Sequence, residues 1–313
     1  MIADSRSDAR ALVLSGGGVR GAYQVGVLRY WLGEERTRYG LLAGTSVGAL
    51  NAAFLAQYPL GEETRAIADL EALWRSLRPN MIARRWFPFG RLHGFWRPAI
   101  FDSRPLQRLI GRTIDAERIR RSGRRLVVGA VSLESGLYRT FDESDPNIVA
   151  AVAASSAFPG YFLPIEIDGE RYTDGGVREE TPVAAVIQAG APIVDVVMTA
   201  PGGVSAPLER RPNAIAVARQ AIDAMLEEVI DTDIAVAELF ERLRGLEDPT
   251  HPPAELRLVR PKSPVRDDVL TFEPATVDRL IRVGYLDVCR VCRAFDSPES
   301  ERSLQNPADD GSI

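Results

Sequence analysis

Residues 11–32 read ALVLSGGGVRGAYQVGVLRYWL, and this stretch decides the fold class. Four apolar residues at 11–14 predict a buried strand, and residues 22–32 predict a helix that follows a run of glycines. Residues 41–57, LLAGTSVGALNAAFLAQ, show the same order of short strand, glycine-containing turn and helix. Two such units predict an α/β protein with a mostly parallel sheet covered by helices on both faces.

The rest of the chain continues the alternation of apolar strands and helices. Proline is favoured at the first helical position, so Pro146, Pro182 and Pro274 are expected to open helices. Glycine and proline at 200–213 and 245–254 predict loops. Further strands are expected at 126–133, 163–167, 170–172, 193–199 and 256–259, with a hairpin arm at 137–141. We expect one domain over residues 8–296 and a disordered tail over residues 297–313.

The composition is that of a folded globular domain. Of the 313 residues 45% are apolar, and the net charge of −5 provides no electrostatic attraction to nucleic acid. The polar N-terminus lacks the apolar core of a secretory signal, and no apolar run reaches the roughly 18 residues of a membrane span. Cys289 and Cys292 are too few for a disulfide framework, and their helical spacing predicts thiols at or near the core. We expect a cytoplasmic protein that binds no nucleic acid; the oligomeric state stays open.

A candidate nucleophile stands in the second strand-to-helix turn. Residues 44–48 form the motif G-x-S-x-G around Ser46, with Gly44 and Gly48 on either side. Small flanking residues allow the sharp turn that exposes a serine hydroxyl for nucleophilic attack. The alternative is a glycine-tolerant turn that packs against a neighbouring helix. The position after an apolar strand favours the nucleophile.

The first turn carries a run of backbone donors. The amides of Gly16, Gly17 and Gly18 can point together at one anion near a helix N-terminus. That anion is either the oxyanion of an acyl-transfer intermediate or a phosphate, and the spacing does not choose between them. Residues 16–21 also match the dinucleotide pattern G-x-G-x-x-G, but the acidic residue that this pattern needs at the end of the second strand is replaced by Thr45 and Ser46.

A serine nucleophile needs a general base, and the two histidines do not suit this role. His93 lies among aromatic residues and arginines, and His251 lies in a proline-rich loop, so both are expected at the surface. Asp174 follows a predicted strand and precedes Gly175 and Gly176, which allow close backbone approach. A partly desolvated carboxylate gains the proton affinity that a base requires. Asp174 is therefore the candidate base, with an Asp-Gly hairpin turn as the alternative.

Residues 16–21, 44–48 and 174–176, in this order, resemble the three signatures of the patatin-like phospholipase family, and residues 154–159, ASSAFP, resemble a further family segment. The resemblance implies a three-layer α/β/α fold with a mostly parallel central sheet. It also implies a catalytic dyad of Ser46 and Asp174. In the same scheme Gly16, Gly17 and Gly18 form the oxyanion hole, and the supporting loop residues are Arg20, Gly21, Gly44, Gly48, Gly175 and Gly176.

The implied activity is the hydrolysis of lipid acyl esters through an acyl-enzyme, without a metal or organic cofactor. Which acyl group and head group are used stays open. Two other classes remain as alternatives. One is a lipid-binding protein with an idle site, and the other is a nucleotide-binding reductase that uses the glycine run of residues 16–21.

Residues 72–101 contain six arginines and seven aromatic residues but no acidic residue. Arginine and tryptophan together suit an anionic lipid surface, so Trp86 and Trp96 are candidates for peripheral membrane contact. The alternative is a cap, at residues 59–105, whose aromatic rings pack over the core while the arginines reach water. The two interpretations are compatible.

Overall fold

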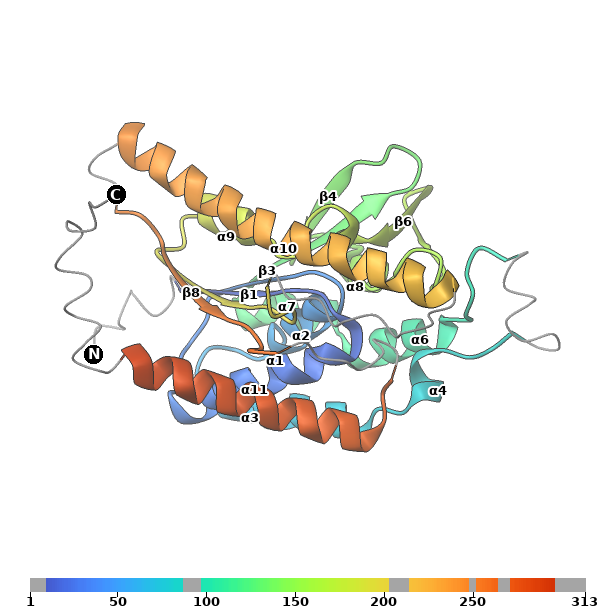
Figure 1. Ribbon diagram of the computed structural model, residues 1–313, viewed down its shortest axis with the longest axis horizontal. Coiled ribbons are helices and arrows are strands. Elements are labelled where there is room, and N and C mark those ends of the chain that lie inside the picture. The colour runs from blue at the N-terminus through green and yellow to red at the C-terminus, as the bar shows by residue number, and fades with distance from the viewer. Residues whose placement is uncertain (1–9, 87–96, 203–213, 248–251, 264–270, 296–313) are drawn as a thin grey trace, which may run out of the picture.

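The computed structural model describes residues 10–86, 97–202, 214–247, 252–263 and 271–295 (Figure 1). Its strands are β1 Arg10–Leu14, β2 Leu41–Gly44, β3 Arg125–Ser132, β4 Tyr138–Asp142, β5 Ile165–Ile167, β6 Glu170–Asp174, β7 Ile193–Val197 and β8 Glu255–Val259. Its α-helices are α1 Gly21–Leu28, α2 Val47–Leu55, α3 Glu63–Ser76, α4 Pro79–Ile82, α6 Arg104–Thr113, α7 Ala116–Ser122, α8 Ile148–Ser155, α9 Val183–Gln188, α10 Ala214–Glu247 and α11 Pro274–Phe295. Short helical segments are η2 Gly18–Arg20, η3 Arg29–Glu34 and η4 Gly175–Val177.

The described strands form one sheet in the order β5-β6-β3-β2-β1-β7-β8, with β4 also paired to β3. The central pairs β3–β2, β2–β1, β1–β7 and β7–β8 are parallel. Only the pairs β3–β4, β3–β6 and β5–β6 at one side are antiparallel. The expected mostly parallel sheet is confirmed.

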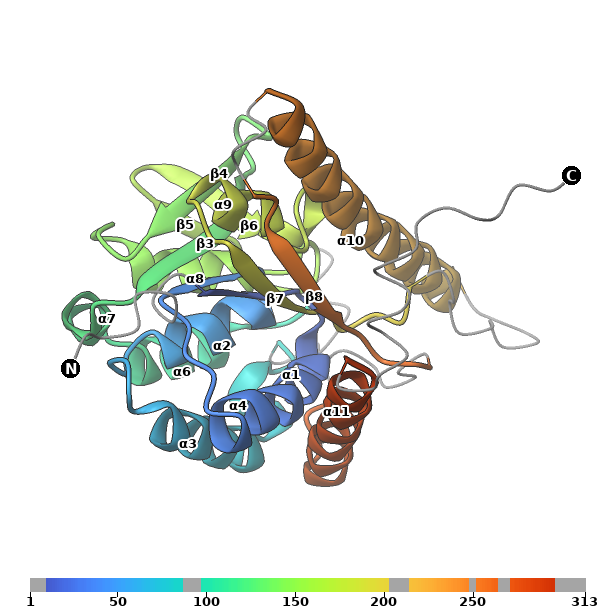
Figure 2. The same ribbon diagram turned by 90° about the vertical axis from the view of Figure 1, so that its left-hand side faces the viewer.

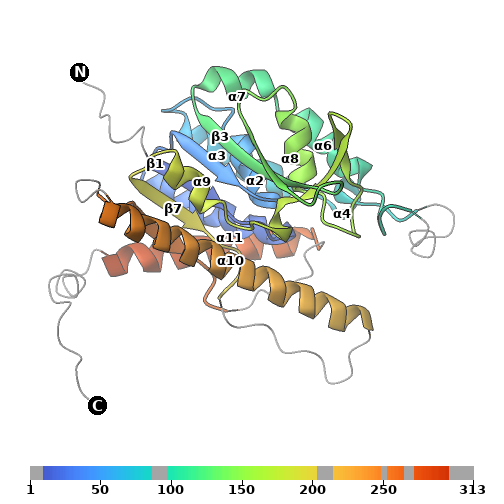
Figure 3. The same cartoon turned by 90° about the horizontal axis from the view of Figure 1, so that it is seen from above.

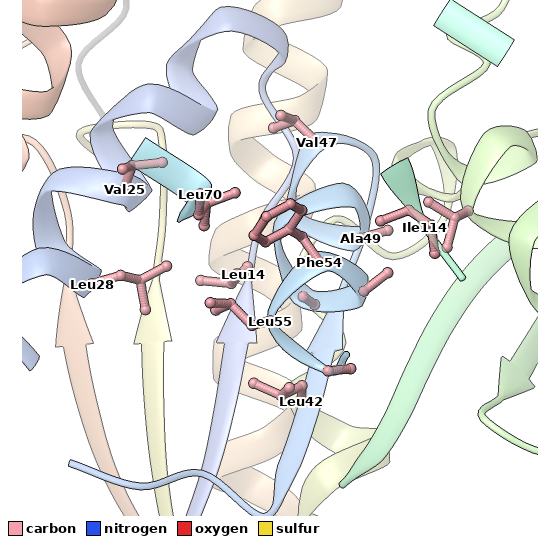
Figure 4. Packing of buried hydrophobic residues seen from close by; sticks show 14 of the residues in the cluster. Leu14, Val25, Leu28, Leu42, Val47, Ala49, Phe54, Leu55, Leu70 and Ile114 are labelled. Atoms are coloured by element: carbon pink, nitrogen blue, oxygen red, sulfur yellow. The ribbon is translucent and has the colours of Figure 1, made fainter. Parts of the chain in front are cut away.

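The central strands are buried on both faces because consecutive residues belong to two different cores. Leu12 and Leu14 of β1 point into the larger core, whereas Ala11 and Val13 point into the smaller one. The larger core is completed by α1, α2, α3, α6, α8 and α11, and the smaller one by α9 and α10. Figure 4 shows Leu14 of β1 packed beside Phe54 and the rest of α2. Strands without polar alternation are what a sheet covered on both faces requires.

The helices form two layers around this sheet. Figure 1 shows α9 and α10 on one side, with α1, α3 and α11 on the other, and Figure 2 shows the same separation after a quarter turn. Seen from above, α10 and α11 lie on the β7 side of the sheet, and α6 and α8 lie on the β3 side (Figure 3). The three-layer α/β/α architecture is thereby confirmed.

Some helix boundaries differ from those predicted. Pro274 opens α11, but Pro182 is the residue before α9, and α8 starts two residues after Pro146, at Ile148. The prediction that a loop begins at Gly245 is wrong, because α10 extends to Glu247. Neither α8 nor α9 has a side-chain cap; Asn147 and Pro182 are the residues that immediately precede them.

Several predictions concern other parts of the chain. Cys289 and Cys292 lie half-buried on α11, and Cys292 packs against the larger core. His93, Trp96, His251 and residues 297–313 lie outside the described residues. Within the described residues, no helix has both the length and the apolar character to cross a membrane.

Candidate active site

The pairing of β3 brings Ser46 and Asp174 together. The first half of β3 pairs with β2, ending where Val128 opposes Gly44, and the second half pairs with β6, starting where Ala130 opposes Asp174. Strand β4 pairs with β3 over both halves, so it occupies the other edge. β2 runs parallel and β6 antiparallel to β3, so their carboxyl ends meet head-on on one edge of β3, opposite Gly129.

Ser46 occupies a strained turn at the end of β2. Its backbone has φ 54° and ψ −124°, outside the regions that residues with a Cβ prefer, which costs on the order of 1–3 kcal/mol. Ser155 Oγ accepts a hydrogen bond from the Ser46 amide at 2.9 Å, and Ser156 Oγ donates to the Ser46 carbonyl oxygen at 3.2 Å. These two hydroxyls, at the end of α8, hold the turn in place. A strained residue that the structure holds from both sides is a feature of functional sites.

The turn also needs close contact between α2 and the sheet. A Cβ atom on Gly48 would lie 2.1 Å from the Leu14 carbonyl oxygen, and one on Gly44 would lie 2.4 Å from the Gly48 carbonyl carbon. Neither position therefore tolerates a side chain, because backbone atoms cannot move aside. This contact places the amino end of α2 directly behind Ser46.

Asp174 is buried and only half satisfied. Its side-chain oxygen Oδ1 accepts a hydrogen bond from the Gly176 amide at 2.9 Å, whereas Oδ2 has no hydrogen-bond partner among the described residues. Burial raises the pKa of Asp174 to about 7, against a smaller lowering by the Ser46 hydroxyl and by the Gly176 amide. A carboxyl group with such a pKa changes its protonation state near neutral pH.

The glycine loop between β1 and α1 lines the site with two of its glycines and bonds elsewhere through the amide of a third. Gly17 has φ 136° and Gly18 has φ 58°, which favour glycine. Both line the same cavity as Ser46 and Asp174. The Gly16 amide, in contrast, donates to the Glu180 carbonyl oxygen at 3.3 Å. Gly17 and Gly18 therefore face the cavity, and Gly16 anchors the loop.

A buried chain of hydrogen bonds fixes this loop to the surrounding helices. Trp74 Nε1 of α3 donates to Asn51 Oδ1 of α2 at 2.8 Å, and Asn51 Nδ2 donates to Gln24 Oε1 of α1 at 2.8 Å. Gln24 Nε2 then donates to the Ser15 carbonyl oxygen at 2.7 Å. The donors and acceptors are satisfied along the chain, and such a network holds its parts in one arrangement.

The site opens into a large apolar cavity. The cavity is partly open to solvent, and Ser46, Asp174, Gly17 and Gly18 lie in its wall. Its apolar lining comes from α2, α3, α4, α6, α10 and the segments beside them, and consists mainly of Val47, Leu50, Phe54, Leu70, Leu73, Trp74, Leu77, Ile82, Leu106, Leu109, Ile110, Phe162, Ile222, Leu226, Ile230 and Phe272. A long hydrocarbon chain fits such a lining.

The remaining predicted residues lie around this centre. Arg20 lines the cavity, its guanidinium NH2 lies 3.7 Å from Asp223 Oδ1, and its Nε has no partner among the described residues. Gly21 packs against Val47, where a Cβ atom would lie 2.4 Å from Cγ2. Gly175 packs against Gly129, and a Cβ atom on Gly175 would lie 2.5 Å from the Gly129 carbonyl oxygen.

Sequence reasoning missed three groups. Ser155 and Ser156 stand in the segment ASSAFP, whose resemblance was visible while its contact with Ser46 was not. Glu180 lines the cavity, and no motif in the sequence distinguishes it from acidic residues at the surface.

The site therefore combines a strained serine and a buried carboxyl group beside an apolar cavity, on a three-layer α/β/α fold. The family model of patatin-like phospholipases matches residues 12–187 of the chain. The match covers more than half of the chain, and the chain belongs to the patatin-like phospholipase family.

Individual relatives are more distant. The chain is 28% identical over 200 residues to the uncharacterized protein YjjU of Escherichia coli K12, covering 61% of this chain and 52% of YjjU. It is 27% identical over 206 residues to a cGAMP-activated phospholipase of Vibrio cholerae, covering 56% of each. The chain thus spans about half the length of these relatives. The crystal structure of VipD from Legionella pneumophila aligns with TM-score 0.45 and 14% identity, over 91% of this chain and 67% of that chain.

Proposed function

We propose that the protein is a lipid acyl hydrolase in which Ser46 is the nucleophile and Asp174 the general base. The observation that carries this proposal is the meeting of β2 and β6 on one edge of β3, which puts a strained serine and a buried carboxyl group in the wall of one apolar cavity. Family membership supports the same reaction class.

In this mechanism Asp174 takes the Ser46 hydroxyl proton while Oγ forms a bond to the ester carbonyl carbon. The open oxygen Oδ2 suits that step, since Oδ1 already accepts from Gly176. The ester C–O bond then breaks, and the leaving alcohol takes the proton back from Asp174. A water molecule, deprotonated by Asp174, hydrolyses the acyl-enzyme, and the proton returns to Ser46. The route uses no metal and no organic cofactor.

The developing oxyanion requires donors that are fixed before reaction. We assign this role to the amides of Gly17 and Gly18, which line the cavity, and we assign Gly16 the role of an anchor because its amide bonds Glu180. Each preorganised donor of this kind contributes about 3 kcal/mol to transition-state stabilisation. Gly17 tolerates no side chain, since a Cβ atom there would lie 2.2 Å from Thr199 Oγ1.

The substrate class follows from the cavity. Its apolar lining suits the acyl chain of a phospholipid, a lysophospholipid or a neutral glyceride. The relative from Vibrio cholerae is named a phospholipase, and on that ground phospholipids come first in a substrate panel.

The test combines a fluorophosphonate probe with hydrolysis of that panel. The native protein should be labelled and should release fatty acid, and Ser46→Ala should lose both activities. Asp174→Asn should lose at least a hundredfold in kcat. Ser76→Ala is the matched control, because Ser76 is exposed on α3 and bonds only the Leu73 carbonyl oxygen among the described residues.

Full hydrolysis by Ser46→Ala would overturn the assignment. Binding of lipid without labelling or turnover by the native protein would favour an idle site. Nicotinamide binding that protects residues 16–21 from proteolysis would favour the reductase alternative.

We further propose a peripheral contact with anionic lipid through Trp86 and the arginines beside it. Trp86 is half-buried, and its Nε1 donates to the Ala99 carbonyl oxygen at 3.0 Å. The Arg97 guanidinium lies 5.4 Å from the centre of the indole ring, while Arg84 and Arg85 are exposed. Exposed arginines next to an indole ring suit the boundary between head groups and acyl chains.

Flotation with phosphatidylglycerol and phosphatidylcholine vesicles tests this contact. The double variant Arg84→Glu/Arg85→Glu should lose most binding to the anionic vesicles, and Trp86→Ala should weaken it several-fold. The control is Arg120→Glu/Arg121→Glu on α7. Equal binding by the native protein and the Arg84/Arg85 variant would refute the contact.

A further inference from the structure

Glu180 is a buried carboxyl group that the mechanism above does not use. It lies between η4 and α9, is 4% exposed and reaches the wall of the catalytic cavity. Its carboxyl group fills the space in front of two motif glycines: a Cβ atom on Gly16 would lie 2.3 Å from Oε1, and one on Gly176 would lie 1.8 Å from Oε2. One carboxyl group therefore separates the glycine loop from the loop that carries Asp174.

The backbone around Glu180 is held from two sides. Its carbonyl oxygen accepts the Gly16 amide at 3.3 Å. Its own amide and that of Thr181 both donate to Asp233 Oδ2 of α10, at 2.9 and 2.8 Å. The Glu180 backbone is consequently held to the glycine loop that follows β1 and to α10.

The charges around Glu180 are mostly negative. Asp174 on β6 and Asp233 on α10 lie close enough to raise its pKa, and Arg20 on η2 lowers it. Burial is the largest cause, and together these effects hold the pKa of Glu180 well above its usual value. Other charged groups nearby are Asp223 and Glu227, which line the cavity from α10, and Glu179, the preceding residue, whose own pKa is raised by burial.

Two carboxylates this close to each other do not both ionise easily, because each charge opposes the other in a dry environment. If Asp174 is the group that ionises to act as base, Glu180 keeps its proton. A neutral Glu180 also leaves the cavity wall free of a negative charge next to Gly16, beside the amides that face the reacting carbonyl group.

We propose that Glu180 is a positioning residue of the oxyanion loop, which as a neutral carboxylic acid holds Gly16 and Gly176 apart and keeps negative charge away from the developing oxyanion. The proposal rests on the hydrolase function proposed above. It requires that loss of the Glu180 proton at alkaline pH lowers the rate, because the new negative charge opposes the oxyanion and disturbs the glycine loop.

The test is the pH profile of kcat/KM with a p-nitrophenyl ester of a medium-chain fatty acid. Native protein should lose activity at alkaline pH. Glu180→Gln, which is uncharged at every pH and has the same shape, should stay within about threefold of native activity at pH 7 and keep that activity at alkaline pH. Glu180→Ala should lose about tenfold or more in kcat with little change in KM. Glu179→Gln is the matched control and should show the native alkaline decline.

An alkaline decline in Glu180→Gln equal to that of the native protein, or native activity in Glu180→Ala, would overturn the proposal. Thermal unfolding keeps this result separate from the hydrolase assignment. A carboxyl group with a raised pKa in the folded state stabilises the protein below its unfolded pKa, and this contribution is lost as pH rises through the folded pKa. Native protein should therefore lose more Tm than Glu180→Gln between pH 5 and pH 9, even if no ester is hydrolysed; equal losses would show that Glu180 is not held neutral.

Discussion

Two groups of buried acidic residues lie at different ends of the sheet, and their surroundings differ. On the side of the amino ends of β2 and β3, Asp195 from the middle of β7 binds the guanidinium of Arg257 and the hydroxyl of Tyr39, which precedes β2. In the same region Glu63 binds Arg124 at 2.7 Å. At the carboxyl ends, Asp174 and Glu180 form no ion pair within the described residues, and their pKa values are raised by burial.

The paired carboxylates contribute to stability, whereas the unpaired carboxyl groups have the raised pKa values that a base requires. A buried carboxylate with a guanidinium partner stays ionised and contributes to a fixed structure. A buried carboxyl group without such a partner costs stability at neutral pH, and it gains a proton affinity that suits a base. Burial without an ion-pair partner therefore distinguishes the end of the sheet that carries the proposed site more clearly than burial alone.

The largest expected effect comes from breaking a pair at the amino end. Arg124→Met leaves Glu63 charged and buried, and it removes the donors to the carbonyl oxygens of Tyr39 and Tyr58. We expect a loss of about 3–5 kcal/mol in the free energy of unfolding, measured by urea denaturation at pH 7. Arg121→Ala, on an exposed pair with Glu117, should change it by less than about 1 kcal/mol. A small effect of Arg124→Met would mean that the pair is not what stabilises this end.

The second effect has the opposite sign and tests the end of the sheet that carries the proposed site. The pKa of Asp174 is about 7 in the folded protein and about 4 in an unfolded chain. Protonation of Asp174 therefore contributes to the free energy of unfolding fully below pH 4, and this contribution is lost as pH rises through 7. At pH 8 Asp174→Asn should gain up to about 4 kcal/mol over the native protein, and at pH 4 the two should be nearly equal. Urea midpoints at both pH values measure this difference. Equal midpoints at pH 8 would contradict the raised pKa.

The same pKa predicts the acid side of the activity profile. The base form of Asp174 is populated as pH rises through about 7, so kcat/KM of the native protein should increase over that range, before the alkaline decline expected from Glu180. A profile that is already flat from pH 5 would show that Asp174 ionises far below its expected range.

The smallest effect concerns one hydrogen bond in the paired cluster. Tyr39→Phe removes the donor at 2.7 Å from Asp195 Oδ2, while Arg257 still binds that oxygen at 2.8 Å. We expect a loss of about 1.5 kcal/mol in the free energy of unfolding, since the charged acceptor keeps its main partner. Tyr58→Phe, whose hydroxyl binds the half-exposed Asp69, is the control and should lose less. Destabilisation equal to that of Arg124→Met would show that the tyrosine, not the arginine, is the main partner.

The sequence predicts the elements better than their contacts. Apolar runs place β1, β2 and β3 within one or two residues, because strands buried on both faces must be apolar throughout. The starts of α8 and α9 are missed by one or two residues, since a proline favours a helix start nearby without fixing the first helical residue. The resemblance names Ser46 and Asp174, but local patterns carry no information on why they meet.

The finer roles in the site depend on contacts between distant segments. No pattern shows that the Gly16 amide is taken by Glu180, 164 residues away, or that Ser155 holds the Ser46 turn. Those contacts arise from the register of β3 and from the packing of α8 and α10, which only the folded chain defines.

The shared edge of β3 also makes the distance between Ser46 and Asp174 independent of chain length. The pairing with β3 fixes the position of both strand ends: β2 ends opposite Val128, and β6 ends opposite Ala130. Residues inserted between α2 and β3, or between α8 and β5, change neither pairing position. Loops of many sizes can therefore be built there while Ser46 and Asp174 keep their distance. One residue added within β3 itself would shift the two ends by about 3.3 Å and turn the next side chain to the other face. The chain can therefore diversify what it recognises far more easily than what it does.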